Sequence, residues 1–139
     1  MWQQLAVHPW AYPALEAVHV LGIALLLGNL VALEARVWGA AARLPLPELA
    51  RLSLTLAGLG FALAAASGLL MFGTQPLELL ANRAFTIKMG LLMLAGANAA
   101  WFHARGSLQK GDTLAKGLMA LSGAIWLAVL GCGRWIAYV

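Results

Sequence analysis

The sequence predicts an all-α integral membrane protein, a bundle of four transmembrane helices with both termini on the same side. Hydrophobic residues make up 63% of the chain, charged residues make up 10%, and the mean hydropathy is +0.84. These values lie far outside the usual range of soluble globular proteins. Four apolar stretches are each long enough to cross about 30 Å of hydrocarbon. We expect one domain, residues 1–139.

The first two spans are predicted at residues 13–33 and 49–72. No Lys or Arg precedes the first span and its apolar run is longer than that of a secretory signal, so we expect a permanent helix. The prolines of "RLPLPEL", residues 43–49, disfavour a continuous helix and begin the second span anew.

The third and fourth spans are predicted at residues 84–101 and 114–133. The segment before the third span, residues 73–85, is amphipathic and is expected to lie at the membrane interface. The polar turn "RGSLQKGDT", residues 105–113, joins the two spans. Asp112 or Thr113 in this turn can cap the fourth helix.

The basic residues predict the orientation of the bundle. Six of the nine lie in or beside the loops that follow the first and third spans: Arg36, Arg43, Arg51, Arg105, Lys110 and Lys116. The other three, Arg83, Lys88 and Arg134, lie at the opposite face. The positive-inside rule therefore predicts a multi-pass protein of the bacterial inner membrane with both termini in the periplasm. Because topology explains the positive charge, no nucleic-acid partner is expected.

Small residues recur within the spans, as in the second span with Gly58, Gly60, Ala64, Ala65 and Gly68. Their simplest role is close packing of helices within the lipid bilayer. The alternative is room for a flat ligand or for a second protomer of a homo-oligomer.

Polar residues inside the spans are the candidates for a functional site, because each is costly if it faces lipid. At 100° per residue, His19, Asn29 and Arg36 lie on one side of the first helix together with Gly22. Lys88, Asn98 and His103 share a broader face of the third helix. We expect these two polar stripes to face each other across the bundle core.

Depth separates the candidates into an outer and an inner site. The first and third spans run in the same direction, which places His19 and Lys88 at nearly the same level near the outer face. His103 lies about 20 Å deeper. One metal ion therefore cannot bind both histidines, and the sequence allows an outer site, an inner site, or both.

The outer site is the richer one: His19, Glu16, Lys88 and Arg134, with sulfur donors from Cys132 and nearby methionines. A neutral imidazole is a common ligand of haem iron and of copper, and sulfur favours Cu(I). Glu16, three residues before His19, can hold the other ring nitrogen.

The inner site is thinner and combines His103 with Arg36, Glu34 and Arg105. Each of these polar residues also has a purely structural explanation. A histidine on an apolar helix can be a hydrogen-bonded packing residue, and Lys88 can extend to the headgroups.

Three segments resemble a known group of proteins: "EAVHVLGIALLLGNLVALEARVWG", "NRAFTIKMGLLMLAGANAAWFHAR" and "GCGRWIAY". The group comprises small bacterial four-helix membrane proteins of uncharacterised function. It is similar to the membrane domain of copper-resistance D proteins and, more remotely, to four-helix membrane protoporphyrinogen oxidases. The shared pattern is a His early in the first span, a basic residue at its far end, and a Lys and a His at the two ends of the third span. Here these are His19, Arg36, Lys88 and His103.

The resemblance to the oxidases implies haem b, with essential residues at the positions of His19 and Lys88. The resemblance to copper-resistance D proteins implies copper handling, with His19 at the position of their first histidine. The leading expectation is therefore a haem b protein with an electron-transfer role, a membrane oxidoreductase among the options, with a quinone or another redox partner. A copper-binding or copper-transport module and a non-catalytic accessory subunit are the alternatives.

Overall fold

The computed structural model describes residues 8–138 and contains four long helices that are apolar enough to cross a membrane. They are α2 (Ala11–Val37), α3 (Leu46–Thr74), α5 (Arg83–Ala104) and α7 (Thr113–Trp135). Short helices α4 (Pro76–Leu80) and α6 (Ser107–Lys110) and a 3-10 turn, η1 (Ile136–Tyr138), complete the described chain. Each predicted span lies inside one of the long helices, so the four-helix membrane fold is confirmed.

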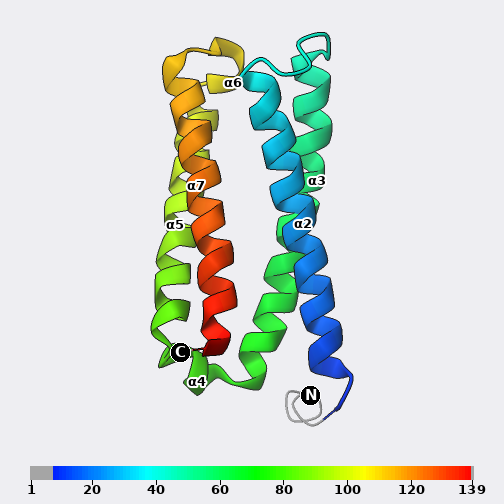
Figure 1. The fold of residues 1–139 in the computed structure, drawn as a ribbon, viewed down its shortest axis with the longest axis vertical. Coiled ribbons are helices and arrows are strands. Elements are labelled where there is room, and N and C mark those ends of the chain that lie inside the picture. Colours follow the sequence, from blue (N-terminus) through cyan, green and yellow to red (C-terminus); the bar gives the residue numbers. More distant parts are fainter. Residues whose placement is uncertain (1–7, 139) are drawn as a thin grey trace.

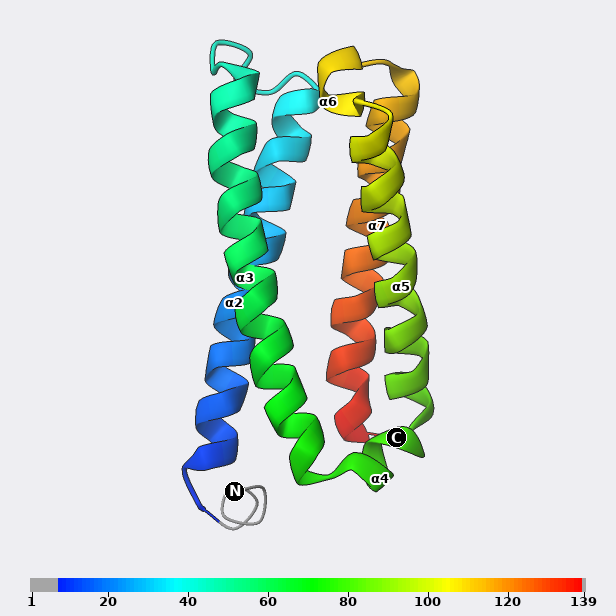
Figure 2. The same ribbon diagram turned by 180° about the vertical axis from the view of Figure 1, so that it is seen from behind.

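The four helices are arranged as two antiparallel pairs, α2 with α3 and α5 with α7 (Figures 1 and 2). Helix α2 begins and α7 ends at the same end of the bundle, which we call the terminal end (Figure 1). The loop end lies opposite and carries the connections within each pair. The two pairs meet chiefly where α2 contacts α7.

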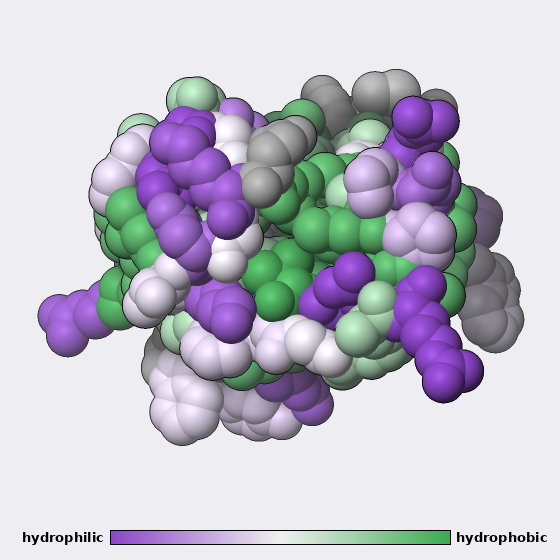
Figure 3. Space-filling model, turned by 90° about the horizontal axis from the view of Figure 1, so that it is seen from above, coloured by the Kyte–Doolittle hydropathy of each residue, from purple (hydrophilic) through white to green (hydrophobic). Residues whose placement is uncertain are grey.

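At the loop end an apolar core joins the two pairs. Its buried members come from all four long helices: Leu33, Ala50, Phe102, Ala115, Leu118 and Met119. Seen from this end, hydrophilic side chains gather over the connections on either side of an apolar strip (Figure 3). A smaller buried cluster, Ala95, Ile125 and Val129, lies within the α5–α7 pair. The loop end is thus the part of the bundle where the core spans both pairs.

Helices α2 and α3 cross with their backbones in direct contact at Gly22 and Gly60. A Cβ atom added to Gly22 would lie 2.6 Å from the backbone nitrogen of Ala64 and 2.6 Å from the carbonyl oxygen of Gly60. A Cβ atom on Gly60 would lie 2.6 Å from the carbonyl oxygen of Gly22. Such distances are shorter than van der Waals contact, so only glycine fits at either position.

The turn before α7 is fixed by one acidic residue. The Asp112 carboxylate accepts a hydrogen bond from the backbone N–H of Ala115 (2.9 Å), which makes it the N-cap of α7 and confirms one of the two predicted caps. The same carboxylate pairs with the Arg105 guanidinium at 2.8 Å. Both contacts favour the ionised carboxyl, and the hydrogen bond from Arg105 is the largest cause that lowers the pKa of Asp112 below its ordinary value.

We expect Asp112→Ala to lower the thermal midpoint of the detergent-purified protein at neutral pH, because the cap and the ion pair are both lost. Since the folded-state pKa is depressed, this stabilisation is complete above the unfolded pKa of about 4 and is lost as the pH falls through the lower folded value. The difference between wild type and variant should therefore shrink in acid. Thr113→Ala is the matched control, and an equal effect of both substitutions would contradict the assignment of the cap.

Candidate functional site

His19 is anchored to α3 by one ring nitrogen. Its Nδ1 lies 2.8 Å from the carbonyl oxygen of Ala64 and 3.2 Å from the hydroxyl of Ser67. A carbonyl oxygen can only accept, so Nδ1 carries the proton and donates it. The hydroxyl of Ser67 donates to the carbonyl of Leu63 at 2.7 Å, which leaves its lone pairs free for the imidazole. The other nitrogen, Nε2, therefore holds a lone pair in the neutral ring.

Gly68 makes room for this imidazole. A Cβ atom on Gly68 would lie 3.3 Å from Cε1 of His19, closer than most carbon contacts. The predicted partner, Glu16, is exposed on α2, and the partners of Nδ1 are Ala64 and Ser67 instead. The prediction for Glu16 was wrong because side-chain spacing along α2 carries no information about the backbone carbonyls of α3.

Lys88 lies on α5 at the terminal end and extends across α7. Its Nζ is 3.3 Å from the position that a Cβ atom on Gly133 would occupy, so the absence of a side chain at Gly133 accommodates the ammonium. His19, near the start of α2, and Lys88, near the start of α5, both lie toward the terminal end of the bundle.

The two polar stripes do not face each other, which corrects the sequence-based expectation. His19 turns toward α3, while the buried Asn98 of α5 donates from its Nδ2 to the carbonyl of Leu118 in α7 at 3.0 Å. Asn29 donates to the carbonyl of Leu25 in its own helix at 2.7 Å. His19 and Asn98 thus each make their interhelical hydrogen bond with the other helix of their own pair.

We expect Asn98→Ala to weaken the packing of α5 against α7 by about 0.6 kcal/mol and by no more than about 1.7, the range measured for hydrogen bonds between membrane helices. Unfolding in mixed detergent micelles, followed by circular dichroism, measures this change. Asn29→Ala is the control, since its hydrogen bond stays within one helix. A larger loss for Asn29→Ala than for Asn98→Ala would contradict the interhelical role.

The remaining predicted site residues make local contacts near the helix ends. Arg134 donates to the hydroxyl of Tyr138 at 3.2 Å and lies over its ring. Arg36 donates from Nε to the carbonyl of Leu44 at 2.8 Å and so holds the α2–α3 connection. His103 is exposed, with its ring edge-on to that of Phe102. None of these contacts involves His19 or Lys88.

Glu34 has a contact that sequence analysis missed. Its Oε2 lies 3.1 Å from the position of a Cβ atom on Gly123, so the carboxylate reaches α7 where the two helix pairs meet. In the sequence, only the glycine at position 123 hints at this contact. Glycine alone does not predict a contact, because an added Cβ atom would meet open space at many other glycines of the chain.

Within residues 8–138, no three side chains of His, Cys, Asp or Glu gather closely enough to hold a metal ion. Comparison of the chain with protein families, with curated proteins and with solved structures finds no match. The resemblance to copper-resistance D proteins and to protoporphyrinogen oxidases therefore stays a prediction.

Proposed function

We propose that the protein binds haem b within the membrane and transfers electrons, and that Nε2 of His19 would hold the iron. The observation that carries this proposal is the hydrogen bond from Nδ1 to the carbonyl of Ala64. Histidines that ligate metals almost always donate their second ring N–H to a carbonyl or carboxylate, which fixes the tautomer and the ring plane. In His19 this leaves Nε2 as the nitrogen that can bind iron.

The donor set around His19 fits a haem better than a bare metal ion. A porphyrin itself supplies four nitrogen ligands, so haem iron needs only one or two from the protein. His19 supplies one. Lys88 is assigned as the second ligand or as the partner of a haem propionate, because the missing side chain at Gly133 admits its ammonium at the terminal end, where His19 also lies.

Each residue of this site has a separate task. When bound, haem supplies a reversible one-electron couple. Ala64 and Ser67 orient the imidazole and make its Nε2 a stronger donor by accepting a hydrogen bond from the Nδ1–H. Gly68 leaves space for the ring, and Lys88 brings positive charge to a region of low dielectric constant.

The position of the proposed site in the membrane indicates the class of its redox partner. His19 and Lys88 lie toward the terminal end, which the positive-inside rule assigns to the periplasmic side of a bacterial inner membrane. A quinone dissolved in the bilayer or a redox protein at that surface is the class of partner that such a site requires.

Absorption spectra of the detergent-purified protein, oxidised and then reduced with dithionite, test the proposal together with metal analysis of the same sample. We expect a Soret band, sharp α and β bands on reduction, and iron bound to the protein. A colourless protein containing copper would contradict the proposal in favour of a copper-binding module. A protein with neither haem nor copper would contradict it in favour of an accessory subunit.

A further inference from the structure

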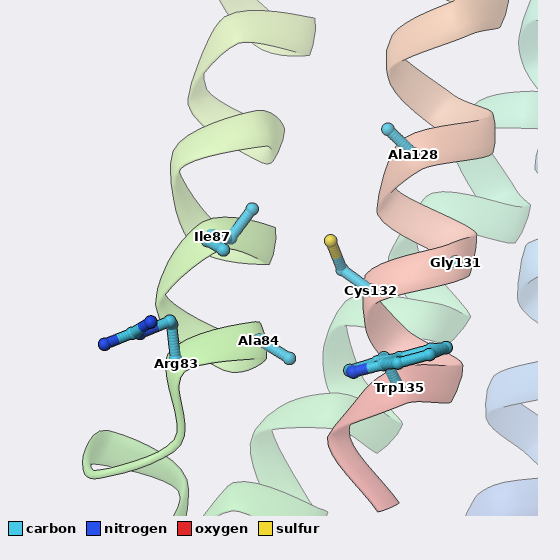
Figure 4. Close-up of a pocket in the computed structure, with 7 residues that line it drawn as sticks. All are labelled: Arg83, Ala84, Ile87, Ala128, Gly131, Cys132 and Trp135. Carbon is cyan, nitrogen blue, oxygen red and sulfur yellow. The ribbon is translucent and has the colours of Figure 1, made fainter. Parts of the chain in front are cut away.

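A groove of about 660 Å³ runs along the α5–α7 pair at the terminal end. Ile87 of α5 and Ala128 of α7 form its walls, the Cys132 sulfur points into the space between the helices, and the Trp135 indole lies across one end (Figure 4). Arg83 lines the rim, with its guanidinium projecting outward (Figure 4). We call this feature the α5–α7 groove.

The position of the groove sets the shape of a ligand. Arg83 is the first residue of α5 and Trp135 is the last residue of α7, so the groove begins at the membrane surface. Ile87 and Ala128 lie four and seven residues further in along their helices, about 6 and 10 Å at 1.5 Å per residue. A ligand that fills the groove must therefore have a polar head at the surface and an apolar part within the bilayer.

The charge at the rim sets the sign of that head. Arg83 is exposed, and in the part of the chain that the structure describes the one ion pair joins Arg105 and Asp112 at the other end of the bundle. Within residues 8–138, Arg83 thus forms no ion pair with a carboxylate. Arginine binds phosphate through charge-assisted hydrogen bonds, and the indole of Trp135 prefers the headgroup region.

We propose that the α5–α7 groove is a binding site for one anionic phospholipid. The phosphate-bearing head lies against Arg83 and Trp135, and one acyl chain follows the surface formed by Ile87, Ala128 and Gly131. Charge complementarity favours an anionic lipid, because the phosphate of a zwitterionic headgroup is already balanced by its own cation, whereas an anionic headgroup brings net negative charge to Arg83. This inference does not depend on haem binding at His19.

The test is a titration of the detergent-purified protein with phosphatidylglycerol and with phosphatidylcholine, with bound lipid counted by native mass spectrometry. We expect one phosphatidylglycerol to bind in preference to phosphatidylcholine. Arg83→Gln should weaken phosphatidylglycerol binding about fivefold, which corresponds to about 1 kcal/mol for one basic residue at a membrane surface. Arg134→Gln is the matched control, since Arg134 lies at the same end but is engaged by Tyr138.

A second variant tests the acyl chain separately from the charge. A Cβ atom added at Gly131 meets no atom within 4 Å, and Gly131 lines the groove, so Gly131→Leu should fill the groove while α5 and α7 stay packed. It should abolish the preferred site although Arg83 is intact. Equal binding of the two lipids, unchanged binding in Arg83→Gln or Gly131→Leu, or an equal loss in Arg134→Gln would each overturn the proposal.

Discussion

Gly22→Ala and Gly60→Ala each separate α2 from α3 and produce the largest loss of stability expected for a one-carbon change in this protein. The new Cβ atom would lie 2.6 Å from backbone atoms of the facing helix in both cases. Because backbone atoms cannot rotate away as a flexible side chain does, the helices must move apart. We expect a loss of about 3 kcal/mol, the upper end of the range for overpacked cores.

The chain provides matched controls on the same two helices. Gly28 of α2 and Gly58 of α3 have no neighbouring atom within 4 Å of an added Cβ. Gly28→Ala and Gly58→Ala should therefore leave stability unchanged or raise it slightly, since alanine favours the helix. Denaturation in mixed micelles compares all four variants. If Gly22→Ala were no less stable than Gly28→Ala, the close crossing of α2 and α3 would be refuted.

His19→Ala should remove the haem spectrum, because the proposed iron ligand is lost. His103→Ala should keep the full spectrum, since His103 is exposed and its described contact is with Phe102. Difference spectra of the two variants, compared at equal protein concentration, provide the measurement. A full haem spectrum in His19→Ala would rule out His19 as the ligand.

A control separates loss of the ligand from loss of the fold. Imidazole added to His19→Ala should restore haem binding if the bundle is intact, because the free base can occupy the vacated space beside Gly68. Ser67→Ala should retain haem with an affinity about 10-fold to 100-fold lower, the usual cost of removing a residue that orients a ligand. An unchanged affinity in Ser67→Ala would show that the carbonyl of Ala64 alone holds the ring.

The fold was predictable from sequence because length and hydropathy alone determine which segments can span a bilayer. The predicted span at residues 49–72, for example, lies within the observed helix Leu46–Thr74. The cap at Asp112 was also predictable, since N-cap preferences depend on local sequence. These features share one property: they depend on residues close together in the chain.

Local sequence did not predict which side of each helix packs against which neighbouring helix. A helical wheel placed Gly22 on the polar side with His19, and the structure shows that this side packs against α3. Gly22 is there to admit the α3 backbone rather than a ligand. The hydrogen-bond partner of His19 is a main-chain carbonyl that every residue possesses, so no side-chain pattern could have identified Ala64.

The pairing of α2 with α3 and of α5 with α7 has a consequence for biosynthesis. Each pair consists of helices that are consecutive spans, so the α2–α3 pair can be complete before the ribosome has made α5. Its glycine crossing and the His19 anchor involve no residue beyond Gly68. The first hairpin can therefore mature co-translationally and serve as a template on which the second hairpin, held by the single connection through α4, docks after insertion.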